Sequence, residues 1–248
     1  MLTCRAQGGG VTLRVVKDIG AFSRITVGRN MNVTLVMADE VHLLPKDVVK
    51  RITPLKKGGV APGHLCIVKA EPSVSKAVDC ATENGSLAIS AQKFKFRRTK
   101  RIDVFVICDS TLTLISGATG GNITTRGCLR LGNVTVRAND AQHISLSATA
   151  KSVRVEATIR SSVRLTGKSN TIDATLGSAS SLDAQGMTCN QLYLTADNES
   201  RATAAVREAA TVSAKGGSSV TMRTAKDAKI DVDEEGSAVI VKPLEITP

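Results

Sequence analysis

The feature that most constrains how this chain folds is a repeat of short apolar pairs in its second half. Two apolar residues separated by one other residue recur about every ten positions, from residue 134 to residue 241. The pairs are Val134/Val136, Ile144/Leu146, Val153/Val155, Val163/Leu165, Ile172/Ala174, Leu182/Ala184, Leu192/Leu194, Ala202/Ala204, Val212/Ala214, Val220/Met222, Ile230/Val232 and Val239/Val241. Apolar residues at alternate positions are typical of half-buried strands. A fixed period indicates a repeat architecture, in which each unit buries its apolar face against its neighbours.

Taken alternately, the pairs form two interleaved series, each with a step of 18 to 20 residues. This step predicts an all-β fold, a right-handed parallel β-helix (β-solenoid) with about 19 residues and two main strands per coil. The inward side chains of successive coils then stack into a continuous core. Corners between strands require small or turn-forming residues. The expected corner residues are Ala138, Ala148, Ala157, Gly167, Gly186, Ala196 and Gly216.

The same register predicts which outward side chains lie side by side on adjacent coils. Three pairs of opposite charge are one 19-residue coil apart: Arg137 with Glu156, Arg154 with Asp173, and Arg164 with Asp183. Neighbouring strands lie about 4.8 Å apart, so each pair contributes on the order of 0.2–1 kcal/mol and disfavours a shifted register. The charges therefore support the solenoid independently of the apolar pattern.

Composition agrees with a stacked all-β fold rather than with a compact enzyme core. Aromatic residues make up only 2% of the chain, with no Trp, one Tyr and four Phe, and a narrow solenoid interior is filled by aliphatic layers. Residues 11–108 are predicted to form a less regular N-terminal β region, with a long excursion at 38–63 that includes a short helix near 47–52. Residues 109–248 are predicted to form the solenoid, and residues 1–10 a flexible tail or the remnant of a signal peptide.

The net charge of +11 is concentrated in one part of the chain, because residues 46–101 contain thirteen Lys and Arg against four Asp and Glu. Basic residues interleaved with aromatic ones bind nucleic acid through phosphates and base stacking. Phe94 and Phe96 lie at strand spacing, however, and are better explained as inward-facing. We therefore disfavour nucleic acid and expect either an anionic glycan or cell surface as partner, or a charged sheet edge that resists pairing. The candidate anionic-ligand surface consists of Lys93, Lys95, Arg97, Arg98, Lys100 and Arg101.

No pattern of catalytic residues stands out in the sequence. The three histidines, His42, His64 and His143, are far apart and lie in no metal-binding or triad motif. The enzymatic alternative is a polysaccharide lyase or glycosidase, because β-helices can present ionisable side chains along an exposed groove. Its candidate carboxylates are Asp173 and Asp183, although each also has an expected arginine partner. We expect a non-enzyme.

The cysteines indicate neither a metal site nor a cofactor. The six of them form no CxxC pair and no cysteine and histidine cluster. Their even number permits disulfides in an oxidising compartment, and Cys66 and Cys80 are the nearest candidate pair in sequence. Cys108 lies in an apolar strand and is more simply a small buried hydrophobe. No stretch is long enough to span a membrane.

Several segments, in this order and spacing, resemble the family described as "putative auto-transporter adhesin, head GIN domain", which is found largely in Bacteroidetes. The resemblance covers about residues 11 to 242 and includes the repeats of roughly 19 residues. The segments that carry it are residues 20–27 (GAFSRITV), 32–35 (NVTL), 84–89 (NGSLAI), 101–106 (RIDVFV) and 114–120 (LISGATG).

This resemblance implies a secreted or envelope-exposed β-helical domain of unknown molecular function, located in the periplasm, at the outer membrane or outside the cell. Residues 1–7 contain no complete signal peptide. The family's Ser-Gly-Ala-Gly turns are mostly replaced here, so no family site residues are carried over. We expect a non-catalytic, adhesin-like binding module whose partner is a glycan or an extracellular protein. The alternative is a structural envelope protein that assembles as a homo-oligomer.

Overall fold

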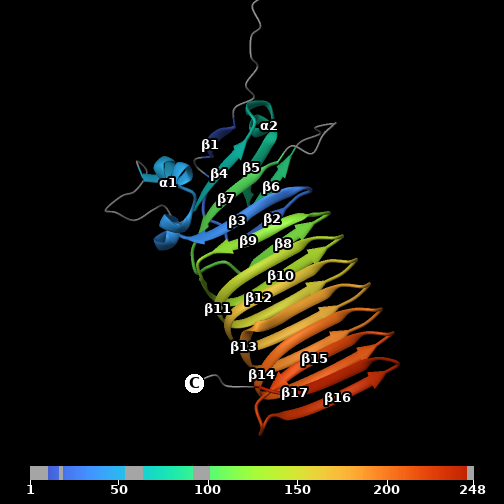
Figure 1. Ribbon diagram of the computed structural model, residues 1–248. Helices are drawn as coiled ribbons and strands as arrows, with labels where there is room; N and C mark the ends of the chain where they lie inside the picture. The colour runs from blue at the N-terminus through green and yellow to red at the C-terminus, as the bar shows by residue number, and fades with distance from the viewer. Residues whose placement is uncertain (1–10, 17–18, 54–63, 92–100, 245–248) are drawn as a thin grey trace, which may run out of the picture.

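The computed structural model describes residues 11–16, 19–53, 64–91 and 101–244. About 67% of the structure is strand, arranged as a β-solenoid of about six turns whose stacked parallel strands are about 20 residues apart. The predicted β-solenoid is confirmed. Figure 1 shows the coils stacked from the N-terminal end at the top to β16 and β17 at the bottom, with the short helices beside or above the N-terminal end.

The elements follow one another along the chain as short N-terminal strands and helices, then long strands, then short ones again. The strands are β1 (Thr12–Val16), β2 (Arg24–Val27), β3 (Met31–Met37), β4 (Leu65–Ala70), β5 (Val78–Glu83), β6 (Ser86–Ala91), β7 (Asp103–Cys108), β8 (Leu114–Ala118), β9 (Gly121–Arg126), β10 (Leu129–Asn139), β11 (His143–Ala157), β12 (Ser162–Leu176), β13 (Ser181–Ala196), β14 (Arg201–Lys215), β15 (Ser219–Thr224), β16 (Lys229–Glu235) and β17 (Ala238–Pro243). The helices are η1 (Ala38–Leu43), α1 (Lys46–Ile52) and α2 (Pro72–Ala77).

Each regular coil is one long strand that contributes to both series of inward residues. β11, β12, β13 and β14 contain 15 or 16 residues each and pair in parallel with one another in chain order. In the first series, Val153 pairs with Ile172 and Ile172 pairs with Leu192; all three are buried. In the second series, Ile144 pairs with Val163, again buried. We call the outer surface over the first series face A and the outer surface over the second series face B.

A third inward segment completes each coil, and it was not predicted. Ala148 pairs with Gly167, and Gly167 pairs with Met187; Ala148 and Met187 are buried. Ala150 and Ser169 occupy the next inward position in their coils and are also buried. These positions hold mostly small or polar residues, so they show little of the apolar contrast from which strands are predicted.

The sharp corners lie between the end of each face A strand and the next face B strand. Each corner contains two consecutive residues with positive φ, the left-handed conformation that residues other than glycine adopt only at a cost. The pairs are Asp140/Ala141, Ile159/Arg160, Ser178/Ala179, Asn198/Glu199 and Gly216/Gly217. Of the predicted corner residues, Gly216 lies in one of these corners. The prediction was wrong for Ala138, Ala157 and Ala196, which are buried strand residues two positions before a corner.

Buried serines fill the inside of successive corners. Ser200 Oγ donates a hydrogen bond to Asp197 O at 2.6 Å, and Ser218 Oγ donates to Lys215 O at 2.7 Å. The backbone N–H of Ser200 in turn donates to Ser218 Oγ at 3.2 Å. Each serine therefore closes its own corner and ties it to the adjacent coil, which satisfies backbone groups that the strands leave unpaired.

The N-terminal coils stack in an order that differs from their order in the chain. β2 pairs in parallel with both β6 and β8, and β3 pairs in parallel with both β7 and β9. The β2 and β3 coil therefore lies between two later ones. Beyond them the pairing becomes antiparallel, β5 with β6, β4 with β7, and β1 with β4. The boundary expected at residue 108 stays a prediction, and both sheets continue across it.

The excursion begins with η1 and α1, which pack on the outside of β3, β4 and β7. The helix expected near residues 47–52 is confirmed as α1. Val48 and Ile52 of α1 are fully buried, in a second apolar cluster with Val36, Ile67 and Ile107. Residues 54–63 of the predicted excursion lie outside the described residues. Where these helices pack, β3, β4 and β7 carry buried residues on both faces. Figure 1 shows the helices beside the sheet.

Candidate functional site

Only one residue of the predicted anionic-ligand surface, Arg101, lies in the part of the chain that the structure describes. Lys93, Lys95, Arg97, Arg98 and Lys100 lie outside it. Arg101 lies two residues before the start of β7, and its side chain is 79% exposed. Its Nε atom lies 2.9 Å from both carboxylate oxygens of Asp103, which raises the pKa of the guanidinium through a hydrogen bond and charge attraction.

Asp103 is the end of a ladder of polar side chains that crosses face B. Asn122 of β9 stacks on Asn32 of β3, which stacks on Asp103 of β7. Asn122 Nδ2 donates to Asn32 Oδ1 at 2.9 Å, and Asn32 Nδ2 donates to Asp103 Oδ1 at 3.1 Å. Three neighbouring strands thus present hydrogen-bonded groups at equivalent positions, with Arg101 at one end.

The ladder forms the floor of an open hollow of about 750 Å³ on the N-terminal coils. A second outward column beside the ladder contributes the hydroxyls of Thr34 and Thr124, which pair across β3 and β9. Lys69 and Arg126 add two further cations to the lining, and Pro45, at the start of α1, belongs to it as well. The lining is mainly polar, and it lies where the excursion interrupts the repeat.

Two ion-pair clusters hold the excursion in this position. Lys69 Nζ on β4 lies 2.6 Å from Asp47 Oδ2 on α1, and this hydrogen bond lowers the pKa of Asp47. Arg130 on β10 lies 2.5 Å from Asp39 Oδ2 and 3.6 Å from Glu40 Oε1 on η1. Glu40 also accepts a hydrogen bond from a backbone N–H of the coil, that of residue 128, at 3.1 Å. Both helices are thereby fixed to the solenoid by charged side chains.

The charge of the hollow is positive once these pairs are taken into account. Lys69 is paired with Asp47, and Arg101 with Asp103. Arg126 is exposed at the end of β9, and no carboxylate of the described ranges lies within ion-pair distance of it. The five cations at residues 93–100 directly precede Arg101 in the chain. This region is therefore suited to a partner that carries negative charge.

Three outward arginines of the regular coils are arranged differently, because each pairs with a carboxylate of the next coil. Arg137 Nε lies 2.6 Å from Glu156 Oε2, Arg154 Nη2 lies 2.9 Å from Asp173 Oδ2, and Arg164 Nε lies 3.5 Å from Asp183 Oδ2. The structure thus brings together all three cross-coil pairs expected from the 19-residue step.

The sequence model of the family described as "putative auto-transporter adhesin, head GIN domain" matches residues 66–225, about two thirds of the chain. The chain belongs to this family. Membership supports an adhesin-like role and a location in the cell envelope or outside the cell.

Solved structures share the fold of this head GIN domain. A "putative adhesin" from Bacteroides fragilis superposes with a TM-score of 0.74 at 14% identity, covering 95% of this chain and 97% of that one. A "putative lipid binding protein" from Parabacteroides distasonis gives 0.61 at 10% identity, with 94% and 97% covered. A "putative adhesin" from the same species gives 0.58 at 13% identity, with 94% and 98% covered. Identities this low show a shared fold alone, and no curated protein matches the sequence.

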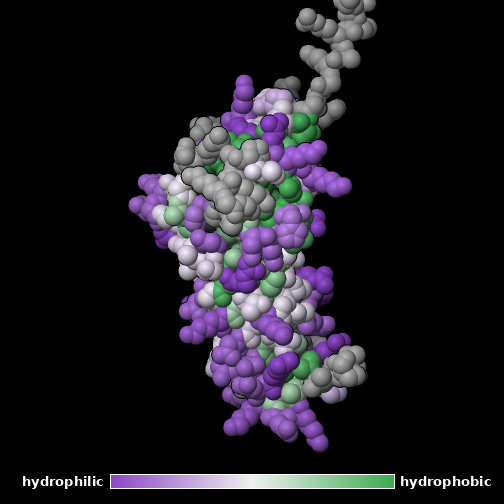
Figure 2. Space-filling model, turned by 90° about the vertical axis from the view of Figure 1, so that its left-hand side faces the viewer, coloured by the Kyte–Doolittle hydropathy of each residue, from purple (hydrophilic) through white to green (hydrophobic). Residues whose placement is uncertain are grey.

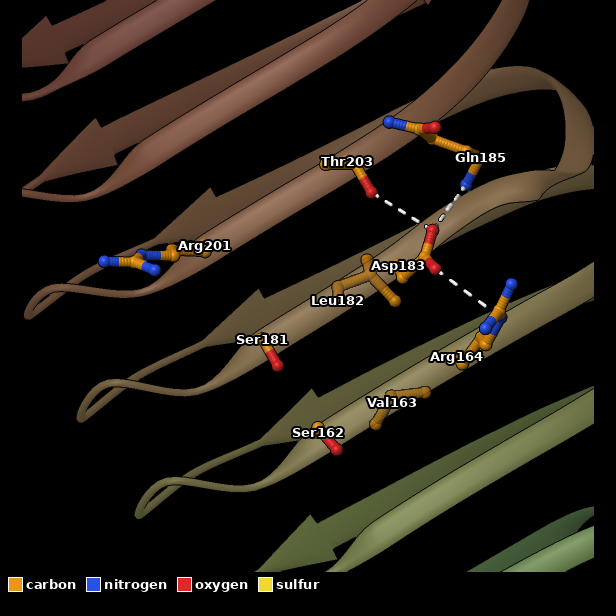
Figure 3. Close-up of a pocket in the computed structure, with 9 residues that line it drawn as sticks. All are labelled: Ser162, Val163, Arg164, Ser181, Leu182, Asp183, Gln185, Arg201 and Thr203. Carbon is orange, nitrogen blue, oxygen red and sulfur yellow. Dashed lines mark hydrogen bonds and ion pairs between the residues drawn. The ribbon is translucent and has the colours of Figure 1, made fainter.

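Asp173 and Asp183, the candidate carboxylates of the enzymatic alternative, do not lie on either side of a single site. Asp173 lies on face A, stacked between Arg154 and Tyr193, whereas Asp183 lies on face B. Figure 3 shows the shallow hollow around Asp183, which accepts hydrogen bonds from Thr203 Oγ1 at 3.2 Å and from a backbone N–H at 3.3 Å, in addition to its ion pair. A carboxylate with these partners is already satisfied as a structural group.

Other candidate chemistry is also accounted for by packing within the described residues. His64 Nε2 lies 3.2 Å from Asp109 Oδ2, and its ring packs edge-on against Phe22 with centroids 4.8 Å apart. No group of three His, Cys, Asp or Glu side chains in the described ranges is arranged to hold a metal ion. Within those ranges, none of the helices has the length and apolar character needed to cross a membrane.

The polar ladder was missed by sequence reasoning, although the sequence contains a signal for it. Residues 32–34 (NVT), 122–124 (NIT) and 103–105 (DVF) share one pattern, an amide or carboxylate, then a buried aliphatic residue, then a second outward residue. Residues 103–105 and 122–124 are one 19-residue step apart, but residues 32–34 of β3, far earlier in the chain, lie between them. Their adjacency became visible only once the stacking order of the N-terminal coils was known.

Proposed function

We propose that this head GIN domain is a non-catalytic, adhesin-like binding module that holds an anionic surface glycan in the hollow on the N-terminal part of face B. The observation that carries the proposal is the ladder of Asn122, Asn32 and Asp103, flanked by Arg101 and Arg126 in one hollow. The domain would act in the cell envelope or on a secreted protein, in keeping with its family.

The ladder offers the chemistry that a polymer of hydroxylated, acidic units requires. Each amide nitrogen carries two N–H donors, and Asn32 and Asn122 each use one of them within the ladder. The second donor of each amide and the hydroxyl of Thr34 are left for a ligand, whereas the hydroxyl of Thr124 donates to the carbonyl of Val33 at 3.5 Å and keeps only its acceptor capacity. A polymer laid across the strands would meet an equivalent group at each coil, and its carboxylate or sulfate groups would find the cations at the rim.

A glycan-binding experiment with two charge-matched variants tests the proposal. Wild type, Arg101→Gln/Arg126→Gln and Arg201→Gln/Arg207→Gln are compared on a panel of acidic and neutral polysaccharides. Both variants remove two exposed arginines, but Arg201 and Arg207 lie on the regular coils. We expect the first variant to lose most binding to acidic polysaccharides and the second to bind as wild type does, with affinity falling as salt is raised.

Three outcomes would count against this function. Equal loss in both variants would mean that net charge alone drives binding, and unchanged binding in both would remove the hollow from the interaction. Turnover of any polysaccharide would replace the binding module with the enzymatic alternative. A third variant with Lys95, Arg97, Arg98 and Lys100 neutralised measures how far the basic run contributes.

A second candidate function, self-assembly, rests on the last coil. Val232 and Val241 occupy inward positions of β16 and β17, yet they are 37% and 47% exposed because no further coil covers them among the described residues. Exposed edge strands with apolar side chains favour pairing with another chain. On the side seen in Figure 2, by contrast, the regular coils show mainly hydrophilic and neutral residues with small hydrophobic areas.

Sedimentation measurements distinguish this candidate from the first. Val232→Lys/Val241→Lys should abolish concentration-dependent association, whereas Tyr193→Lys, which changes another exposed side chain on face A, should not. A wild-type protein that stays monomeric at all concentrations would reject self-assembly and leave glycan binding unaffected.

A further inference from the structure

Two cysteine thiols meet at the N-terminal end of the solenoid core. Cys66 Sγ donates a hydrogen bond to Cys80 Sγ at 3.0 Å, and the residues are 0% and 7% exposed. Cys66 lies on β4 and Cys80 on β5, and both are held as free thiols in the structure. A disulfide places its sulfur atoms about 2.05 Å apart, so a further approach of about 1 Å would join them.

The contact crosses from one sheet of the solenoid to the other. β4 pairs with β7 and β1, whereas β5 pairs with β6. β7 continues the stack of face B through β3 and β9, and β6 continues the stack of face A through β2 and β8. Cys66 and Cys80 therefore lie opposite each other near the N-terminal ends of the two sheets, with β1 beyond β4, and no ladder pairing links β4 with β5 directly.

A cation lies next to this pair. Arg14 of β1 donates a hydrogen bond from Nη2 to the backbone carbonyl of Val78, two residues before Cys80. The hydrogen bond between the sulfurs, together with burial, raises the pKa of Cys66. The same hydrogen bond lowers the pKa of Cys80, and the positive charge of Arg14 also acts to lower it. Cys80 is thus the thiol that ionises more readily and the more exposed of the two.

The other described cysteines lack this environment. Burial raises the pKa of Cys108 and of Cys189 to about 12, and their sulfurs contact backbone carbonyls. Cys128 Sγ lies near a backbone carbonyl and the hydroxyl of Thr149. Cys108 and Cys189 are therefore poor nucleophiles, because the thiolate is the reactive form.

We propose that Cys66 and Cys80 form a disulfide that fastens the two sheets together at the N-terminal end of the solenoid. Disulfides persist in oxidising compartments such as the envelope or the outside of the cell. The bridge would restrain the strands that end the stack, where coil-to-coil pairing gives way to antiparallel strands. The proposal is independent of the glycan-binding function.

The bond forms by thiol–disulfide exchange with a disulfide-bearing oxidant. The Cys80 thiolate attacks one sulfur of the oxidant, which breaks its disulfide and releases one thiolate. The Cys66 thiol then loses its proton and attacks Cys80 Sγ in the mixed disulfide, which releases the second thiolate. Two protein thiols lose two electrons and two protons, and the oxidant's disulfide gains them as two thiols.

Peptide mapping of the full chain after incubation with oxidised glutathione tests the bridge directly. The protein is unfolded with an alkylating reagent and digested with trypsin without reductant. We expect residues 58–69 to be joined to residues 77–93, and reduction to release both peptides. Recovery of both peptides alkylated, or with Cys66 or Cys80 joined to another cysteine, would overturn the proposal.

Thermal unfolding shows whether the bridge fastens the fold. Reduction should lower the unfolding midpoint of the oxidised wild type, and of Cys108→Ala, by several degrees. It should leave the midpoint of Cys66→Ala/Cys80→Ala unchanged. A bridge found by mapping but without effect on the midpoint would reject the fastening role. The mapping needs only wild-type protein, so a variant that fails to fold does not remove the test.

Discussion

The regular coils and the N-terminal coils differ in what their outward polar side chains face. In the regular coils, groups of opposite charge recur at the same position one coil apart and pair with each other, as Arg137 does with Glu156. In the N-terminal coils, the stacking order changes and antiparallel strands and helices interrupt the repeat, so that Asn32, Asn122 and Arg126 line a hollow. Where the coils repeat strictly, a charged side chain meets an opposite charge at the same position of the next coil. Where the repeat is interrupted, some polar side chains face solvent and can bind a partner.

The largest expected difference in stability between the regular coils and the N-terminal excursion comes from truncating two isoleucines that are equally buried. Ile172 lies in the core of the regular coils and Ile52 lies in the outer cluster beneath α1; both are 0% exposed. Ile172→Ala should lower the free energy of unfolding of the whole domain by about 2–5 kcal/mol. Ile52→Ala should mainly loosen η1 and α1. Denaturant unfolding measures the first effect and hydrogen exchange the second, and equal global losses would mean that the excursion is part of the same cooperative unit.

A corner serine is the next most consequential element of the regular coils. Ser218→Ala removes the donor to Lys215 O and the acceptor for the Ser200 N–H. Buried backbone groups left unpaired cost about 1–3 kcal/mol, and we expect a loss of that size in denaturant unfolding. Ser213→Ala, a change at an outward serine of β14, the strand before this corner, serves as the control and should change stability by less than about 0.5 kcal/mol. A Ser218→Ala variant as stable as this control would contradict the corner ladder.

Substitution of one corner residue, Ile159, is expected to stabilise the protein. Ile159 has a φ of 53° and is 45% exposed, whereas the equivalent position in other corners holds Asp140, Ser178, Asn198 or Gly216. A β-branched residue is the most strained of these in the left-handed conformation.

Ile159→Gly should therefore raise the free energy of unfolding by about 0.5–1 kcal/mol, the relief of strain being partly offset by the entropy of glycine. Ile159→Asn should act in the same direction. Ala157→Gly, two residues earlier in the buried strand, should lower stability. Destabilisation by both changes at Ile159 would show that its side chain contributes packing that outweighs the strain.

The regular coils could be predicted from sequence in more detail than the rest, because each coil repeats the previous one at a fixed residue spacing. A 19-residue step fixes the partner of Val153 or Arg154 wherever the alternation of apolar residues is visible. The prediction of the corners failed because Ala138 and Ala157 are small residues that pack in the buried core and do not form the turn. Prediction also failed at the third inward segment, where Ala148 carries little apolar contrast.

The candidate site was only partly predictable for the opposite reason. The basic run next to Arg101 and the excursion both marked the region in the sequence. The ladder depends on β3 lying between β7 and β9, an order that chain position does not determine. Asn32 and Asn122 are 90 residues apart, so no local sequence pattern predicts their hydrogen bond.

The cross-coil ion pairs should contribute less to the free energy of unfolding than the core residues or the corner serines do. A double-mutant cycle on Arg137 and Glu156, each changed to Ala, should give a coupling free energy of about 0.2–1 kcal/mol that falls at high salt. The pair between Arg164 and Asp183, with a longer contact of 3.5 Å, should couple more weakly. A coupling of zero for both pairs would mean that the charges only specify register.

The smallest effect on the whole domain, and the most local, concerns the attachment of η1. The hydrogen bond from Arg130 lowers the pKa of Asp39 below its usual 3.8. A carboxyl group with a depressed pKa in the folded state stabilises that state above its unfolded pKa, and the contribution is lost as pH falls through the folded value. The attachment should therefore be intact at pH 5 to 7 and weaken only below about pH 3.8.

Amide signals of residues 38–43, followed by NMR during an acid titration, measure this weakening against signals from the regular coils. Asp39→Asn should loosen η1 already at neutral pH and remove its contribution to the titration, while global unfolding stays near that of wild type. Asp47→Asn, which breaks the contact with Lys69, should do the same for α1. If Asp39→Asn instead destabilised the regular coils as much as η1, the excursion would be an integral part of the stack, and the division between a self-satisfying repeat and an interrupted, ligand-facing end would not hold.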